Sequence, residues 1–314
     1  MQDQVATVFG GSGFVGRYVV QRLAELGAVI RVPTRRPERA LFLKPLGGIG
    51  QINIEPWNPS ASGEVERVLA GSDHAISLVG ILFESRKGDF DRLQARLPGE
   101  IGTAATRLGL RRVVHVSAIG AEATSPAVYA RTKAAGEQAL RAAFPAATIL
   151  RPSIVFGPED AFFNRFARMS QLMPVLPLIG GGRTRFQPVY VVDVAEAVMA
   201  ALQRDDVAGR TYELGGPGVA TFRELLHYLL RVTGRRRLLL NLPFGLARLQ
   251  AALLEWLPLP PLTRDQVEML KRDNVASPTM PGLADLGVAP TPYEVIVPQY
   301  VRTFSLPTAR LPAV

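Results

Sequence analysis

The feature that most constrains this chain is a run of glycines directly after its first apolar segment. Residues 5–9 (VATVF) have the composition of a strand, the segment GGSGFVG of residues 10–16 follows, and a helical pattern comes next. Glycines at a strand end permit a sharp turn and leave room for a pyrophosphate, which the N–H groups of the next helix can bind. The spacing of Gly10, Gly13 and Gly16 therefore predicts a dinucleotide site; the alternative is a tight turn without a ligand.

The residues after the second predicted strand indicate which dinucleotide binds. Thr34-Arg35-Arg36-Pro37 stand where an NAD site would present a carboxylate to the ribose. A guanidinium suits a 2′-phosphate, whereas a carboxylate would repel it. We therefore expect NADP(H), with Arg35 the stronger candidate and Arg36 beside it. The alternative is that both arginines are solvated loop charges.

Strand-like and helical segments alternate over the first half of the chain. The alternation predicts an α/β fold, a Rossmann-type doubly wound parallel sheet, whose ligand edge lies at the carboxyl ends of the strands. The predicted strands are 5–9, 28–32, 51–54, 74–79, 112–117 and 148–150, and the predicted helices are 17–27, 63–70, 90–108 and 129–143. Pro98-Gly99 should kink or split the third helix.

The length of 314 residues indicates more than one domain. We expect an NADP(H)-binding domain over 1–160, with 186–215 returning to it, and a smaller, mainly helical lobe from 161–185 and 216–314. Asp193 is expected to be the N-cap of a helix over 194–203.

Composition excludes several kinds of site. The chain has no cysteine, which excludes disulfides and thiolate catalysis, and its three scattered histidines favour no metal site. No leader pattern and no apolar run of transmembrane length occur, so we expect neither export nor a membrane span. The net charge of +9 favours an anionic lipid, nucleic acid or acidic protein as partner without choosing among them.

Tyr129 and Lys133 are the strongest catalytic candidates. Four residues apart on a helix, they share one face. A lysine beside a phenol lowers the phenol pKa and can hold a nicotinamide ribose, so the pair could pass a proton to a carbonyl during hydride transfer. The alternative is a chance pair.

Together these motifs resemble the extended and atypical short-chain dehydrogenase/reductase family over residues 4–215. The matching positions are Gly10, Gly13, Gly16, Ser117, Tyr129, Lys133 and the segments 151–158 and 189–193. The cofactor-binding residues we expect are Gly10, Ser12, Gly13, Phe14, Val15, Gly16, Arg35, Arg36, Leu78, Val79, Gly80, Ser117, Tyr129, Lys133, Pro152 and Ile154.

One departure from the family concerns activity. The family places a hydroxyl at the end of the fifth strand to bind the substrate carbonyl, and here that position falls on Ser117 or on Ala118. With Ser117 the catalytic set of Ser117, Tyr129 and Lys133 is complete. With Ala118 it is vestigial.

A closer resemblance extends over nearly the whole chain. Segments 42–47, 78–84, 156–166 and 283–292 are similar to the nucleotide-binding accessory subunits of respiratory complex I and their bacterial relatives. The resemblance implies a tightly held NADPH with a structural or regulatory role, and docking with other complex I subunits on the peripheral arm near the membrane and the quinone site. It implies a peripheral location on the cytoplasmic side of the bacterial inner membrane, and no nucleic-acid partner.

Two other functions stay open. One is a free NADP-dependent oxidoreductase or epimerase acting on a small carbonyl, sugar or lipid-like substrate; the other is a redox-sensing module in which cofactor occupancy gates a protein contact.

A predicted helix over 243–256 has a stripe of four leucines, Leu246, Leu249, Leu253 and Leu257. The stripe is either core or a contact surface for a partner or an anionic lipid surface. The arginines 235–237, just before this region, would favour the contact, because they can meet lipid phosphates or acidic residues.

Overall fold

The chain forms two compact units, each assembled from separate stretches of sequence. The computed structural model describes residues 1–257 and 260–305. The first unit comprises Met1–Pro152, Val192–Leu214 and Ser277–Ala289, and the second comprises Ser153–Val191, Gly215–Ala276 and the described part of Pro290–Val314.

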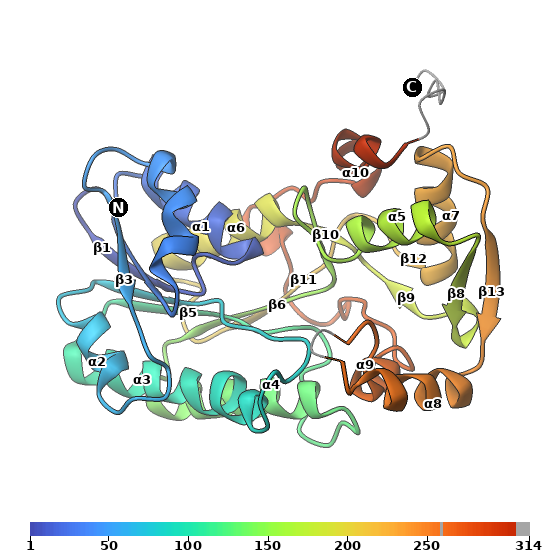
Figure 1. The fold of residues 1–314 in the computed structure, drawn as a ribbon. Coiled ribbons are helices and arrows are strands. Elements are labelled where there is room, and N and C mark those ends of the chain that lie inside the picture. The colour runs from blue at the N-terminus through green and yellow to red at the C-terminus, as the bar shows by residue number, and fades with distance from the viewer. Residues whose placement is uncertain (258–259, 306–314) are drawn as a thin grey trace. The chain divides into compact units, whose positions relative to one another are not determined.

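The first unit is built on a seven-stranded parallel sheet with the order β11-β6-β5-β4-β1-β2-β3. Its strands are β1 (Val5–Phe9), β2 (Val29–Thr34), β3 (Ile52–Pro56), β4 (His74–Ser77), β5 (Arg112–Val116), β6 (Thr148–Pro152) and β11 (Thr211–Leu214). Helices α1 (Phe14–Glu25) and α6 (Val191–Gln203) cover one face, and α2 (Glu64–Leu69), α3 (Leu97–Leu108) and α4 (Val128–Ala143) cover the other (Figure 1). The predicted doubly wound Rossmann-type fold is therefore confirmed.

Burial on both faces explains why these strands are almost continuously apolar. Phe9 and Ala75 from the sheet pack with Leu97, Ile101 and Leu140 of the helices below it. Trp57, directly after β3, meets the Phe9 ring edge to face, with 5.3 Å between ring centres. Tight packing of this kind fixes the carboxyl ends of the strands, where the candidate site lies.

The predicted helix over 90–108 is not split at Pro98-Gly99. A π-helix, η2 (Asp91–Arg96), runs directly into α3, because Arg96 and Leu97 both have helical backbone, and Pro98 stands at the start of α3. The Gln94 side chain in η2 donates from Nε2 to the carbonyl oxygen of Ile81 at 2.9 Å. A Cβ on Gly136 would lie 2.0 Å from the Gln94 carbonyl oxygen, so only glycine allows α4 to pack this closely against η2.

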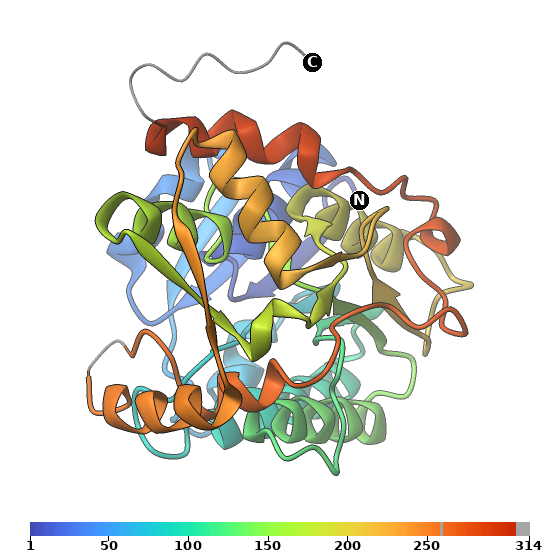
Figure 2. The same cartoon turned by 90° about the vertical axis from the view of Figure 1, so that its right-hand side faces the viewer.

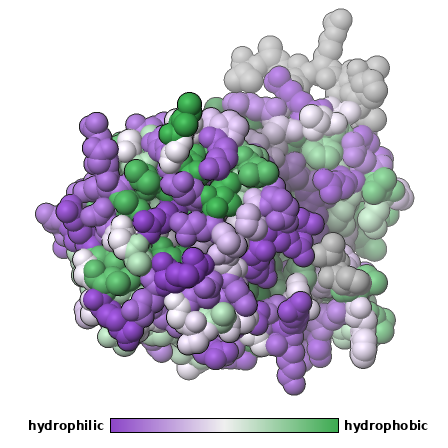
Figure 3. Space-filling view, turned by 60° about the vertical axis from the view of Figure 1, so that its left-hand side comes forward, coloured by the Kyte–Doolittle hydropathy of each residue, from purple (hydrophilic) through white to green (hydrophobic). Residues whose placement is uncertain are grey.

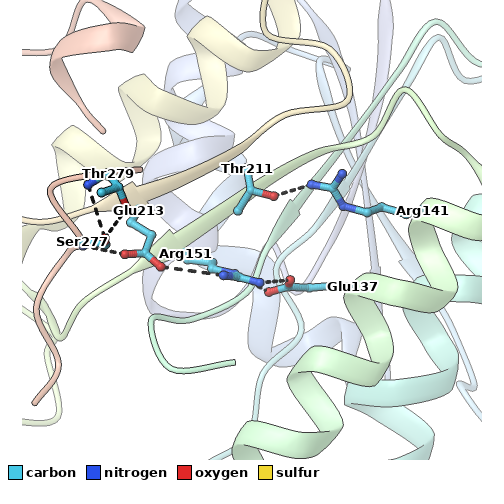
Figure 4. A network of polar contacts seen from close by, with 7 residues as sticks. All are labelled: Glu137, Arg141, Arg151, Thr211, Glu213, Ser277 and Thr279. Carbon is cyan, nitrogen blue, oxygen red and sulfur yellow. Dashed lines mark hydrogen bonds and ion pairs between the residues drawn. The ribbon is translucent and has the colours of Figure 1, made fainter. Parts of the chain in front are cut away.

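A charged network closes the β11 edge of the sheet (Figure 4). The Arg151 guanidinium donates to both carboxylate oxygens of Glu137 on α4, at 2.9 and 2.6 Å, and lies 3.7 Å from Glu213 on β11. Glu213 in turn accepts from the backbone N–H of Ser277 at 2.8 Å. The Glu137 and Glu213 carboxylates raise the pKa of Arg151, and the network ties the 277–289 segment to the sheet edge.

The second unit consists of helices around three two-stranded sheets (Figures 1 and 2). Its strands are β7 (Val155–Phe156), β8 (Val175–Ile179), β9 (Arg185–Phe186), β10 (Val189–Tyr190), β12 (Ala220–Thr221) and β13 (Leu238–Leu242), and its helices are α5 (Phe163–Leu172), α7 (Phe222–Val232), α8 (Phe244–Leu254), α9 (Arg264–Met269) and α10 (Tyr293–Val301). Phenylalanines 156, 163, 186 and 222 form the centre of its core.

The expected N-cap role of Asp193 is wrong. Helix α6 begins at Val191, so Asp193 lies in its first turn. The partial positive charge of a helix N-terminus favours an acidic side chain anywhere in the first turn. The sequence signal therefore located the start of this helix only to within a turn.

The leucine stripe of α8 is not core. Leu246, Leu249 and Leu253 are 58%, 62% and 71% exposed, and the face of α8 that is buried carries Ala247 and Ala251. Trp256, just past the helix, is 89% exposed. Positions 258–259 of the same predicted region lie outside the described residues. The other interpretation, a contact surface, stays open for the stripe.

The described helices are all too short or too polar to cross a bilayer.

Candidate functional site

The glycine loop follows β1 as the sequence predicted. Gly10 has φ of +81°, which favours glycine, and a Cβ there would lie 3.0 Å from the Leu78 carbonyl carbon at the end of β4. A Cβ on Gly16 would lie 2.2 Å from the Gly10 carbonyl oxygen, so Gly16 allows α1 to pack against the loop. Of these three glycines, Gly13 has the most space, since an added Cβ would lie near one atom only, the Gly10 carbonyl oxygen at 3.1 Å. Gly13 is thus the glycine whose missing side chain leaves room for a ligand.

The other predicted loop residues lie at the start of α1. Gly13 is the N-cap of α1 and, having no side chain, makes no cap hydrogen bond of its own. Ser12, Phe14 and Val15 are partly exposed around it. A helix start with a glycine N-cap suits a pyrophosphate, because its N–H groups need an acceptor.

The turn after β2 presents arginines and no carboxylate. Arg35 and Arg36 are exposed, and Glu38 is the only acidic residue between positions 27 and 54. The Arg36 N–H donates to the Thr34 hydroxyl at 3.3 Å, which fixes the backbone of the turn. The turn lies beside the glycine loop, since a Cβ on Gly11 would lie 3.0 Å from the Val32 side chain.

Lys133 lies at the carboxyl ends of β4 and β5. Its ammonium group is buried and donates to the Val116 carbonyl oxygen at 3.3 Å, and a Cβ on Gly80 would lie 3.5 Å from it. Burial lowers the pKa of Lys133 to about 8, against the attraction of Glu137, which raises it. An ammonium held in this way can donate to a ribose hydroxyl and stay largely charged at neutral pH.

Ser117 follows β5 and is buried. Its N–H donates to the Leu150 carbonyl oxygen at 2.7 Å, while its hydroxyl has no hydrogen-bond partner among the described residues. A buried hydroxyl without a partner is costly unless a ligand or water satisfies it. Ala118, the alternative register position, is partly exposed.

Tyr129 lies one helical turn before Lys133 on α4. Its ring meets Phe90 edge to face, with 6.3 Å between ring centres. Pro152, at the end of β6, is buried beside the end of β5, since its carbonyl oxygen accepts from Ile119 at 3.0 Å. Ile154 belongs to the second unit and packs against the phenylalanine core there.

Sequence reasoning missed a buried pair on the strands beside Lys133. His115 on β5 contacts the Ser77 hydroxyl on β4 through Nδ1 at 3.1 Å, and its Nε2 has no partner among the described residues. Burial, with the positive charge of Lys133, lowers the pKa of His115 to about 3, so the ring is neutral at pH 7. Ser77 and His115 are partners in the parallel pairing of β4 with β5, and their polar side chains in otherwise apolar strands are the signal that could have revealed the pair.

Sequence reasoning also missed Arg17. The carbon at the centre of its guanidinium lies 4.7 Å from the centre of the Phe42 ring, in the 3-10 helix η1 (Pro37–Leu46) that follows the arginine turn. The pattern gave no signal for this contact, because the two residues lie 25 positions apart in elements of different type.

No cluster of three or more His, Asp or Glu side chains that could hold a metal ion occurs in the described part of the chain. The polar groups at the site are therefore a lysine, a tyrosine, hydroxyls, arginines and backbone N–H groups. These suit a phosphorylated organic cofactor.

The model of the NAD dependent epimerase/dehydratase family matches residues 6–215, which include the glycine loop, Tyr129 and Lys133. The chain belongs to this family. Among solved structures, a dTDP-glucose 4,6-dehydratase from Streptomyces venezuelae with NAD and TYD bound superposes with a TM-score of 0.73 at 20% identity, covering 95% of this chain and 96% of that one. At this identity the likeness concerns the epimerase/dehydratase fold alone.

Relatives within the curated proteins are more similar in sequence. The mitochondrial NADH dehydrogenase [ubiquinone] 1 alpha subcomplex subunit 9 of Arabidopsis thaliana is 38% identical over 298 residues, which are 91% of this chain and 74% of the plant protein. The same subunit of Mus musculus is 35% identical, over 93% of this chain and 78% of the mouse protein. This member of the epimerase/dehydratase family is thus homologous to complex I subunits beyond the matched 6–215 region.

Proposed function

We propose that the protein is an NADP(H)-binding accessory subunit of respiratory complex I, in which the cofactor has a structural or regulatory role. The observation that carries the proposal is the similarity to complex I subunits over more than nine-tenths of the chain. A likeness spread over both units supports shared assembly, since a shared nucleotide site alone would explain only the first unit.

The site supports a nicotinamide cofactor. Gly13 gives the pyrophosphate space, the start of α1 gives it N–H donors, and the buried Lys133 ammonium can hold the nicotinamide ribose. The absence of a carboxylate near Arg35 and Arg36 favours NADP(H) over NAD(H). When bound, the cofactor would supply hydride chemistry, and a structural role requires only its binding.

The second unit supports contact with an anionic membrane surface. The exposed Leu246, Leu249 and Leu253 of α8 provide an apolar face, and the arginines 235–237 precede the neighbouring strand β13. We place the protein with other complex I subunits on the peripheral arm, near the membrane and the quinone site. In a bacterium this is the cytoplasmic side of the inner membrane.

Two substitutions on α4 test this function against catalysis. Tyr129→Phe removes the phenol hydroxyl and keeps the ring against Phe90, so a scaffold should keep full NADH:quinone activity. A true reductase step should fall by about 10²- to 10⁴-fold, since that is the usual contribution of a general acid. Lys133→Met removes the ribose contact and should lower both cofactor retention and the amount of assembled complex I.

A free NADP-dependent oxidoreductase or epimerase is the second candidate. The buried Ser117 hydroxyl favours it, because together with Tyr129 and Lys133 it would complete a reductase set. If Tyr129→Phe abolished an NADPH-dependent reduction while complex I stayed intact, this candidate would replace the accessory subunit.

A further inference from the structure

The contact between Arg17 and Phe42 places a third guanidinium beside the arginine turn. Arg17 lies in the first turn of α1, where its N–H donates to the Gly13 carbonyl oxygen at 3.1 Å. Its guanidinium is 4.7 Å from the Phe42 ring centre, within the range at which a cation is attracted to an aromatic face. The side chain therefore runs from the glycine loop toward η1.

The elements that carry these cations are neighbours. Strands β1 and β2 are adjacent and parallel, so the glycine loop after β1 and the turn after β2 share one edge of the sheet. Arg35 and Arg36 occupy that turn, and η1 with Phe42 begins at Pro37, directly after it. Arg17 thus comes from α1, which precedes β2 in the chain, and Arg35 and Arg36 come from the turn that follows β2.

The charges of this corner fit a phosphate monoester. Glu38 is the only acidic side chain in positions 27–54, and the first turn of α1 has none. A phosphate monoester carries close to two negative charges at neutral pH and offers three acceptor oxygens, which forked guanidinium donors match. Leu41, Phe42 and Ile49, in the segment that follows β2, are exposed apolar side chains. The face drawn in Figure 3 is largely hydrophilic, with hydrophobic patches among the hydrophilic groups.

We propose that Arg17, held by the Phe42 ring, binds the 2′-phosphate of NADP(H) together with Arg35 and Arg36, and so determines selectivity against NAD(H). The inference rests on the proposed cofactor. Arg17 is half-buried and stacked, whereas Arg35 and Arg36 are exposed. A side chain that is already restrained loses less conformational entropy on binding. Arg17 therefore contributes more to selectivity than Arg36, and Phe42 is a positioning residue.

The test measures the Kd of NADPH and NADH by calorimetry with the full chain. Arg17→Gln should weaken NADPH about 10- to 100-fold, the range for a charge-assisted contact, and leave NADH unchanged within about twofold. Phe42→Leu, which keeps the charge and removes the ring, should weaken NADPH by a smaller factor and should likewise leave NADH unchanged. The matched control is Arg111→Gln, which removes a charge just before β5, at the amino ends of the parallel strands.

Several outcomes would overturn the inference. Equal losses for NADPH and NADH in Arg17→Gln would assign Arg17 to the pyrophosphate or to folding, and the thermal melting of the ligand-free variant separates these two. If inorganic phosphate displaced NADPH from the parent as effectively as 2′,5′-ADP, the corner would be a free phosphate site. A parent chain that binds NADH as tightly as NADPH would contradict the proposed cofactor itself, a result distinct from any failure of Arg17.

Discussion

The three glycines of the loop differ in what an added side chain would meet, and this separates folding from binding at single positions. The Cβ of Gly16 would collide with backbone, whereas that of Gly13 would make one tight contact, 3.1 Å from the Gly10 carbonyl oxygen, which a shift of a few tenths of an ångström relieves. Gly13 is also in extended backbone with φ of −80°, which any residue can adopt. The space at Gly13 is thus available to a ligand and is not needed by the fold.

Gly13→Val should abolish NADPH binding, since the side chain fills the space of the pyrophosphate, and should cost about 1 kcal/mol of stability as a poorer N-cap. Gly16→Ala should instead destabilise the ligand-free protein by about 1–3 kcal/mol through overpacking. Denaturation of both variants without ligand, together with calorimetry, distinguishes the two. A Gly13→Val protein that retains stoichiometric NADPH would contradict the placement of the site.

His115 predicts a pH dependence of stability. Its pKa is lowered by burial to about 3, so below its ordinary value of 6.5 the unfolded chain takes up a proton that the folded protein excludes. The contribution of His115 to stability is complete above pH 6.5 and falls as the pH decreases, by at most about 1.4 kcal/mol per pH unit. His115→Gln should flatten the decrease between pH 6 and 4.5. Parallel curves for parent and variant would contradict the assignment.

At the scale of elements, the sequence predicted the parallel strands and their crossover helices because their apolar periods and glycines are local signals. It could not predict the π-helix η2, which depends on the close packing of Gly136 against Gln94. Nor could it assign the stripe of α8, since an apolar helix face looks the same whether its neighbour is core or solvent. The contact of Arg17 with Phe42 likewise arises only from tertiary structure.

The Arg151 network should stabilise the β11 edge. Glu137→Gln keeps the shape of the side chain and leaves Arg151 with Glu213 at 3.7 Å, so we expect a loss of about 1–3 kcal/mol in the free energy of unfolding. The control is Glu66→Gln, which removes an exposed partner of Arg107 and should cost less than about 0.5 kcal/mol. Equal effects in chemical denaturation would show that the network adds nothing beyond a surface pair.

The leucine stripe of α8 should bind membranes without stabilising the fold. A double variant, Leu249→Ser with Leu253→Ser, exposes no new apolar surface and should change the free energy of unfolding by less than about 0.5 kcal/mol per site. Its binding to vesicles that contain anionic phospholipid should fall about 100-fold or more, since two leucines that each contribute about 1.5–3 kcal/mol when fully buried amount to at least about 3 kcal/mol. Leu41→Ser, an exposed leucine of the first unit, is the control. Unchanged sedimentation with vesicles would exclude α8 as the contact.

At the scale of the whole molecule, the two units have different tasks in this account. The first unit carries every predicted cofactor residue except Ile154, and the second carries the exposed stripe of α8. The sequence analysis expected the first domain to extend to residue 160 and to include 186–215, whereas the first unit ends at Pro152 and regains Val192–Leu214 and Ser277–Ala289. The proposed partners, complex I subunits, were inferred from similarity over nearly the whole chain, because a docking surface has no local sequence pattern of its own.

The most direct test of the central claim is native electrophoresis of mildly solubilised membranes that contain the tagged full chain, followed by identification of the nucleotide released from its band. The account predicts that the chain migrates with NADH:ubiquinone oxidoreductase activity and releases NADP(H) in stoichiometric amount. Migration as a free protein of 34.0 kDa, with the oxidoreductase activity in a separate band, would contradict it.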